Sequence, residues 1–264
     1  MDLGLRGRTA MVTGGSNGIG RAAAEAFAAE GANVVLTYHS DEAAASDLVH
    51  LVRSEGGRAI AVPLALEDRA SIGAAAQAAV DAFGGVDVLV ANAVRWPSQM
   101  PAQGRFENID ADYWRAMLAA NVEGTVATIA AVLPSMRERG WGRIVLVSSS
   151  VAEEGVPGPS PYGVSKSAYM GIARQLAWDV GRDGILVTVV GTGFTVTERN
   201  LARFPDRTRE AVAAHSPSRR LSRPEDVARL IVFLGSEGNA NITGEIVYDG
   251  SSNGRSGHVA ATAR

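Results

Sequence analysis

A serine, a tyrosine and a lysine in the middle of the chain have the types and spacing of a proton-transfer site. Tyr162 and Lys166 are four residues apart, which places both side chains on one face of a helix. A positive charge near a phenol, whose ordinary pKa is about 10, favours its ionised form, so this tyrosine is expected to exchange protons at physiological pH. Ser149 follows the apolar run 144–147, so its hydroxyl is expected at the carboxyl end of a strand, where it can stabilise charge on a carbonyl oxygen.

A glycine-rich turn near the N-terminus predicts a dinucleotide site. Residues 13–20, Thr-Gly-Gly-Ser-Asn-Gly-Ile-Gly, join the apolar strand 9–12 to an Ala-rich helical stretch over 21–30. The glycines permit the tight turn out of the strand and leave room for a cofactor beside the backbone. The free N–H groups of the helix are expected to face a pyrophosphate. The predicted cofactor contacts from this turn are Gly14, Ser16, Asn17, Gly18, Ile19 and Gly20.

Together the two motifs resemble the short-chain dehydrogenase/reductase family, and the similarity extends over nearly the whole chain. The Thr-Gly-x-x-x-Gly-x-Gly turn of that family matches residues 13–20, and its Asn-Asn-Ala-Gly motif is met in part by 91–94. Its Tyr-x-x-x-Lys motif matches Tyr162 and Lys166. Within the family, the chain looks most similar to 3-oxoacyl-carrier-protein reductases and related ketoreductases.

The resemblance implies roles for individual residues. The implied catalytic group is Asn121, Ser149, Tyr162 and Lys166, with Ser150 as the alternative serine. Lys166 is expected to lower the tyrosine pKa and hold the nicotinamide ribose, and Asn121 to support a water that relays protons to Lys166. Further implied cofactor contacts are Asn92, Tyr162, Lys166, Gly193, Thr195 and Thr197. The chain departs from the family pattern at Ala65, Ala91, Val94, Thr192 and Ser251.

The end of the second predicted strand, 33–37, indicates the choice of cofactor. An acid there would bond the ribose 2′-OH of NAD and repel the 2′-phosphate of NADP. The chain has the polar residues 37–40 instead, and Asp41 and Glu42 are interpreted as the first turn of the next helix. NADP(H) is therefore preferred, with NAD(H) as the alternative. His39 is either a cofactor contact or an exposed turn residue.

The elements that must position these residues alternate between strand and helix. Most predicted strands are continuous apolar runs, as in parallel strands covered on both faces. The alternation predicts an α/β fold, a doubly wound, Rossmann-type parallel sheet of about seven strands in three layers. Predicted strands cover 9–12, 33–37, 58–62, 86–91, 143–148, 185–190 and 245–248, and predicted helices 18–30, 42–55, 69–83, 111–139, 162–181 and 224–234.

Composition favours one dinucleotide-binding domain over residues 1–264. The chain of 264 residues is 46% hydrophobic, which is enough for a substantial core. The absence of cysteine excludes disulfides and thiolate metal ligands, and no metal site is expected. A net charge of −3 argues against nucleic-acid binding. With no evident signal peptide and only short apolar runs, a cytoplasmic protein without membrane contact is expected.

The segment 193–221 is predicted to be the substrate lid, because it has little strand character and carries Phe194, Phe204 and His215. Trp96, Pro97 and Met100 are predicted to form the facing wall. The lid arginines are either a solvated surface or a patch for an acyl carrier protein or another anionic substrate; they are Arg199, Arg203, Arg207, Arg209, Arg219, Arg220 and Arg223.

The predicted function is NADPH-dependent reduction of a small-molecule ketone on an acyl-thioester or polyketide-like substrate. The alternatives are an enoyl-thioester (C=C) reductase of the same family and a protein that binds the cofactor without turnover. The family resemblance implies a homo-oligomer, a tetramer formed through the helices 111–139 and 162–181. The tail 251–264 is turn-rich and is predicted to be disordered or to reach a neighbouring subunit.

Overall fold

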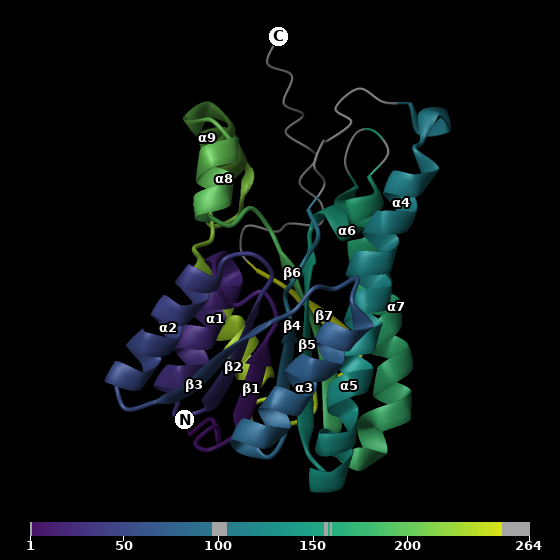
Figure 1. Ribbon diagram of the computed structural model, residues 1–264. Helices are drawn as coiled ribbons and strands as arrows, with labels where there is room; N and C mark the ends of the chain where they lie inside the picture. Colours follow the sequence, from purple (N-terminus) through teal and green to yellow (C-terminus); the bar gives the residue numbers. More distant parts are fainter. Residues whose placement is uncertain (1, 97–104, 156–157, 159, 250–264) are drawn as a thin grey trace.

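Seven parallel strands form one sheet between two layers of helices in the computed structural model, which describes residues 2–96, 105–155, 158 and 160–249 (Figure 1). The strand order is β3-β2-β1-β4-β5-β6-β7, which confirms the predicted doubly wound sheet. The strands are β1 (Thr9–Val12), β2 (Asn33–Tyr38), β3 (Arg58–Pro63), β4 (Val88–Ala91), β5 (Gly142–Ser149), β6 (Ile185–Thr192) and β7 (Glu245–Tyr248). Strand order reverses at β1, which pairs with β2 on one side and β4 on the other. Such a reversal opens a ligand cleft at the carboxyl ends of the strands.

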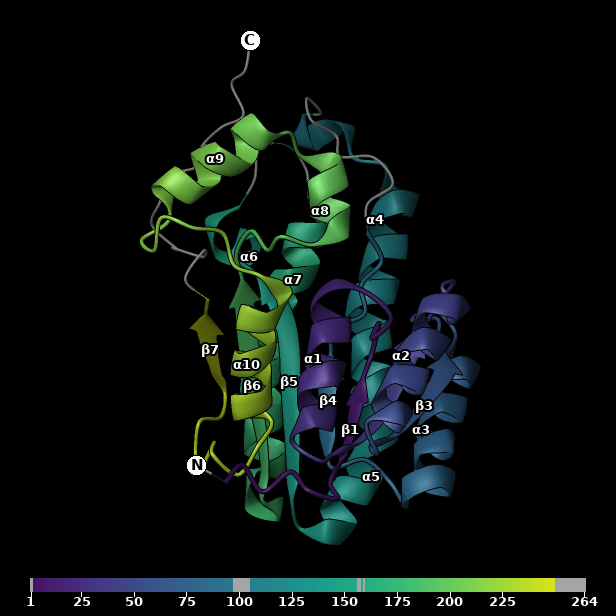
Figure 2. The same cartoon turned by 90° about the vertical axis from the view of Figure 1, so that its left-hand side faces the viewer.

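Apolar helix faces bury both sides of the sheet (Figures 1 and 2). One side is covered by α1 (Gly18–Ala29), α2 (Glu42–Ser54) and α10 (Pro224–Leu234), and the other by α3 (Arg69–Phe83), α5 (Thr125–Arg139) and α7 (Pro161–Val180). The shorter elements are η1 (Phe106–Asn108), α4 (Ala111–Leu118), η2 (Ala119–Gly124), α6 (Val151–Glu154), η3 (Gly181–Asp183), α8 (Glu198–Arg203) and α9 (Asp206–His215). Because every central strand is buried on both faces, its side chains are almost all aliphatic.

The helix predicted over residues 111–139 is interrupted by a π-helical turn, η2, between α4 and α5. The turn lies where the helix meets the loop after β3, since a Cβ on Gly124 would lie 2.2 Å from the Leu66 carbonyl oxygen. Inserted π turns often occur at functional positions, and this one carries Asn121. The whole stretch is long and apolar enough to cross a membrane, but it packs against α3, α7, β4 and β5 as a core helix.

Helix α10 begins at Pro224, as the sequence predicts. Arg223 is its N-cap, and the Asp226 carboxylate accepts a hydrogen bond from the Arg223 N–H at 3.0 Å. Ser222 pairs with Thr195 at the base of the segment 193–221. This segment contains α8 and α9, which lie beyond the carboxyl ends of the strands (Figure 1). Pro97, Met100, Ser251 and the predicted tail 251–264 lie outside the described residues.

Candidate active site

The loop after β4 is hydrogen-bonded to the glycine-rich turn between β1 and α1 and holds it in place. Gly14 and Gly18 have φ values of +63° and +54°, a region that glycine adopts without strain. A Cβ on Gly20 would lie 2.2 Å from the Gly14 carbonyl oxygen, so the turn requires glycine there. The Asn92 amide donates to the carbonyl oxygens of Thr13 and Gly14, each at 3.0 Å. Helix α1 begins without a side-chain cap, so its first N–H groups are available to an anion.

Polar residues after β2 form one end of a cleft beside this turn. The hydroxyl of Thr37 accepts from the Gly14 N–H at 3.2 Å, so Thr37 supports the turn from within the core. His39, Ser40 and Asp41 line the cleft. The Asp41 carboxylate accepts from Asn17 at 3.1 Å and from the Ala44 N–H, and these two hydrogen bonds lower its pKa. Sequence reasoning assigned Asp41 to the next helix, and it is the N-cap of α2 as well as a cleft residue.

Ser149 and Tyr162 meet at the carboxyl end of β5. Ser149 is the last residue of the strand, and Tyr162 lies in the first turn of α7, which Ser160 caps by accepting from the Gly163 N–H at 3.1 Å. The Ser149 hydroxyl lies close enough to the Tyr162 phenol to act on its pKa. Burial raises the pKa of Tyr162 to about 12, while Ser149 and the charge of Arg199 act in the opposite direction. The phenol is therefore protonated at neutral pH.

Ser150, the alternative serine, has a structural role. Its N–H donates to the Thr192 carbonyl oxygen at 2.8 Å, and its carbonyl oxygen accepts from the N–H groups at the start of α6. Of the two serines, Ser149 is the one whose hydroxyl lies close enough to act on the pKa of Tyr162.

Lys166 is buried, and its position differs from the expectation in one respect. Its Nζ donates to the Val147 carbonyl oxygen at 2.7 Å and lies 4.4 Å from the ring centre of Tyr169. Desolvation lowers the pKa of Lys166 to about 7, because the charged ammonium loses its water shell in the core. The amine is thus only partly charged at neutral pH. The expected lowering of the Tyr162 pKa by Lys166 is therefore wrong for this state, in which Arg199 is the cation that lowers it.

Asn121 fixes the backbone of the loop after β4. Its carboxamide oxygen accepts from the Arg95 N–H at 2.7 Å, and its amide donates to the Arg95 carbonyl oxygen at 3.1 Å. The Asn121 carbonyl oxygen accepts from the hydroxyls of Thr125 and Tyr169 at 2.8 and 3.0 Å. Both polar ends of Asn121 are thus bonded to protein groups, so Asn121 positions the loop after β4, and the implied water relay stays a prediction.

The remaining predicted contacts lie at the base of the segment 193–221. The Gly193 N–H donates to the Asp249 carboxylate at 3.0 Å, and Thr195 is buried. Thr197 caps α8 and lies against the glycine turn, since a Cβ on Gly18 would be 3.2 Å from its methyl group. Thr197 therefore brings the start of α8 to the cofactor side of the cleft.

An aromatic and cationic stack, which sequence reasoning did not predict, covers the tyrosine. The indole of Trp96 stacks on the Tyr162 ring, with centroids 5.1 Å apart and planes inclined by 20°. The Arg199 guanidinium lies 4.3 Å from the centre of the same indole. Trp96 and Arg199 were each noted in the sequence, as a wall residue and a lid arginine. No sequence signal pairs them, because they are about a hundred residues apart.

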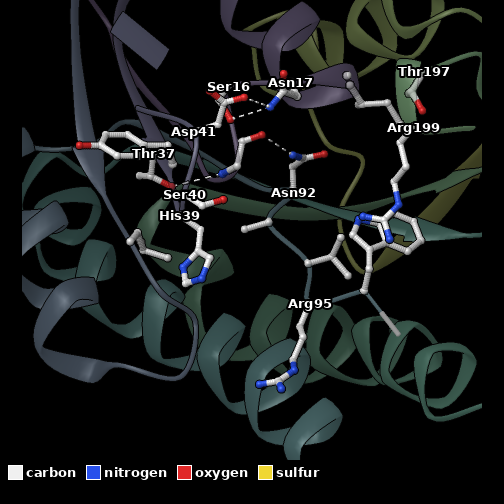
Figure 3. Close-up of a pocket in the computed structure, with 18 of the residues that line it drawn as sticks. Ser16, Asn17, Thr37, His39, Ser40, Asp41, Asn92, Arg95, Thr197 and Arg199 are labelled. Atoms are coloured by element: carbon white, nitrogen blue, oxygen red, sulfur yellow. Dashed lines mark hydrogen bonds between the residues drawn. The ribbon is translucent and has the colours of Figure 1, made fainter. Parts of the chain in front are cut away.

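The cleft has a volume of about 730 Å³ and runs between the glycine turn and the start of α8. Figure 3 shows His39 and Ser40 at one end and Thr197 and Arg199 at the other. Of the predicted cofactor contacts, those that line it are Gly14, Ser16, Asn17, Gly18, Ile19, His39, Asn92 and Thr197. Gly20, Tyr162, Lys166, Gly193 and Thr195 are not among its described lining residues. The uncapped helix start and the glycine cradle fit the pyrophosphate of a nicotinamide dinucleotide.

Comparison with known proteins agrees with this geometry. Residues 14–250 match the family model described as Enoyl-(Acyl carrier protein) reductase. The chain is 33% identical to the 3-oxoacyl-(acyl-carrier-protein) reductase FabG of Vibrio cholerae, over 93% of this chain and 97% of the relative. It is 35% identical to dehydrogenase/reductase SDR family member 4 of Sus scrofa, over 93% and 87%. A solved 7α-hydroxysteroid dehydrogenase, complexed with NADH and a 7-oxo bile acid, superposes with a TM-score of 0.87 at 28% identity, over 96% of each chain.

The fold and the site define a dinucleotide-dependent oxidoreductase with a serine–tyrosine–lysine group at the strand ends. The chain belongs to the short-chain dehydrogenase/reductase family, as its resemblance implied. It is an NAD(P)-dependent enzyme that acts on CH–OH and C=O groups. The relatives' activities argue against the alternative of a protein that binds a cofactor without turnover.

Proposed function

We propose that the protein reduces a ketone to an alcohol with NADPH, on an acyl-thioester or polyketide-like substrate. The observation that carries this proposal is the placement of Ser149, at the end of β5, beside Tyr162 in the first turn of α7, one helical turn from Lys166. The similarity to a 3-oxoacyl-(acyl-carrier-protein) reductase supports a ketoacyl substrate. Tyr162 and Lys166 are separated by three residues, and this spacing favours carbonyl over C=C chemistry.

The bound nicotinamide supplies the hydride for the carbonyl carbon. Ser149 and Tyr162 hold the ketone oxygen between their hydroxyls and stabilise the negative charge that develops on it. Because its pKa of about 12 keeps Tyr162 protonated, the phenol transfers its proton to that oxygen and completes the alcohol. Lys166, with a pKa of about 7, exchanges protons at neutral pH and restores the phenol. Asn121 keeps the loop that faces the tyrosine in place.

NADPH is the proposed cofactor because the carboxyl end of β2 carries His39 and Ser40 in the cleft. Asp41 opposes this preference, but its charge is offset by Asn17 and by the start of α2. The segment 193–221 is proposed to close over the substrate, with Phe194 packed edge-on against Phe204 at 5.2 Å. We further propose a cytoplasmic homotetramer that buries α5 and α7.

Several of the lid arginines form hydrogen bonds or ion pairs with groups of the same chain, which argues against their binding a carrier protein. Arg209 bonds to Asp206 and to the Phe204 carbonyl oxygen, and Arg220 bonds to Asp226 at 2.5 Å. A solvated surface therefore accounts for these members of the set. Arg199 differs from them, since its contact is the Trp96 ring.

The direct test is NADPH consumption with a β-ketoacyl thioester and with the matched enoyl thioester. We expect turnover of the ketone and its loss in Tyr162→Phe, by about a hundredfold or more, because the variant keeps the ring but lacks the proton. Turnover of the enoyl substrate alone would support the runner-up, a C=C reductase, which the description of the matching family model favours. Equal rates in the wild type and Tyr162→Phe would contradict acid catalysis by this residue.

A further inference from the structure

Arg199 is an exposed cation that lies close to the catalytic tyrosine. It is in the first turn of α8 and lines the cleft together with Trp96 and Thr197. Its guanidinium lies over the Trp96 indole, and the same indole stacks on Tyr162. The charge of Arg199 lowers the pKa of that phenol, so the two groups are electrostatically coupled. Trp96 therefore links the guanidinium in the cleft to the catalytic phenol.

The guanidinium is oriented by the ring but is not neutralised. Within the described part of the chain, Arg199 forms no ion pair with a carboxylate. The neighbouring residue Glu198 also lines the cleft. Burial lowers the pKa of Arg199, and the positive charge of Arg203, one helical turn further on, lowers it as well. Like charges four residues apart destabilise a helix, and α8 has only six residues. An anion bound at this point would offset the repulsion.

Stacking leaves the edge of a guanidinium open for a planar anion. An arginine on an aromatic face keeps its N–H fork in the ring plane, where it can bind a carboxylate with two parallel hydrogen bonds. We propose that Arg199 recognises a carboxylate on the ketone substrate, within a few bonds of the carbonyl group that Ser149 and Tyr162 bind. The inference rests on the proposed ketone reduction and narrows its substrate to a ketone that also carries a free carboxylate.

The test compares ketones that differ only in charge. Oxo acids of increasing chain length and their methyl esters are assayed with the wild type, Arg199→Gln and the matched lid variant Arg203→Gln. We expect the wild type to prefer the acid, and Arg199→Gln to reduce the acid-to-ester ratio of kcat/KM by roughly tenfold to a hundredfold, as for a lost charge-assisted pair. Arg203→Gln should leave the ratio within about threefold, because its guanidinium faces Phe204.

Binding measurements separate this inference from the proposed function. Calorimetric titration of the oxo acid and its ester onto the NADP-loaded protein reports recognition without turnover. Preference for the acid that depends on Arg199, with neither ketone reduced, would overturn the proposed function and leave the carboxylate site standing. If both ketones are reduced and the acid-to-ester ratio of kcat/KM is the same in the wild type and Arg199→Gln, the inference alone would be overturned. A higher Kd for NADPH in Arg199→Gln, with an unchanged acid-to-ester ratio of kcat/KM, would assign Arg199 to the cofactor phosphates and would also overturn the inference.

Discussion

The indole of Trp96 covers the phenol ring of Tyr162 in a near-parallel stack, with centroids 5.1 Å apart. The contact joins the loop after β4 to the first turn of α7, two elements that are distant in the sequence. Asn121 holds that loop by both polar groups of the Arg95 backbone. The orientation of the catalytic phenol therefore depends on a side chain that lies outside the serine–tyrosine–lysine group.

Replacing Trp96 should affect catalysis more than stability. Trp96→Ala removes the stack and admits water to the phenol, and an aromatic pair contributes about 0.5–1.5 kcal/mol, so kcat/KM should fall roughly threefold to tenfold. Trp96→Phe should retain most of the activity, because a smaller ring still covers the phenol. Steady-state kinetics with a neutral ketone measure this effect without involving Arg199. An increase in kcat for Trp96→Ala would instead mean that the indole obstructs the site.

Removing the Asn121 side chain should release the loop that carries Trp96. Asn121→Ala leaves the N–H and the carbonyl oxygen of Arg95 without their partner, which should cost about 1–3 kcal/mol in the free energy of unfolding. Urea denaturation measures this loss. Thr125→Val is a matched control, since its hydroxyl contacts the Asn121 backbone and not the carboxamide. Unchanged stability in Asn121→Ala would contradict the positioning role.

The glycine turn and the serine–tyrosine–lysine group were predictable because each is local in the sequence. The turn could be predicted because a strand, the glycines and a helix follow one another in the sequence. The helices α3 and α10 also match their predicted bounds. Apolar runs located all seven strands, with a shift of one or two residues at six of the fourteen strand ends. Such features depend on neighbouring residues, so periodicity and turn chemistry suffice to find them.

Contacts between distant segments were not predictable in this way. The π turn at Asn121 arises from the packing of Gly124 on the loop after β3, which leaves no trace in helical periodicity. Burial, a property of the folded core, brings the pKa of Lys166 to about 7 and prevents the expected effect on the tyrosine. The pairing of Trp96 with Tyr162 and Arg199 depends on how three separate elements meet.

The charge of Asp41 should limit the preference for NADPH. Asp41→Asn removes a negative charge from the cleft but keeps an oxygen that can cap α2, so stability should change little. We expect the Kd for NADPH to decrease several-fold and the Kd for NADH to change less, because only NADPH carries the 2′-phosphate. His39→Ala should increase the Kd for NADPH. If fluorescence titrations show equal changes in the Kd for NADPH and NADH, the 2′ position of the ribose binds away from Asp41.

A tryptophan on α7 offers a test of the proposed tetramer. The Trp178 side chain is 90% exposed, an unusual position for a large aromatic residue, and Val126 on α5 and Val164 on α7 are also exposed. If these helices pack against a second copy, Trp178→Glu should lower the molar mass in light scattering by a factor of two or four. Glu245→Gln, on the edge strand β7, serves as a control that should leave the mass unchanged. An unaltered mass for Trp178→Glu would exclude this surface as the interface.

The burial of Lys166 should make its effect on stability depend on pH. Its pKa is about 7 in the folded chain, against 10.5 in the unfolded chain, so between these values the unfolded state binds one more proton. Wild-type stability therefore gains up to about 1.4 kcal/mol per pH unit over this window, whereas below pH 7 the cost of the buried ammonium is fully present. Lys166→Met lacks this group. Its stability relative to the wild type should be highest and constant below pH 7 and should decline as the pH rises to 10.5. Urea denaturation at several pH values measures the difference, and a difference independent of pH would show that the amine keeps its ordinary pKa.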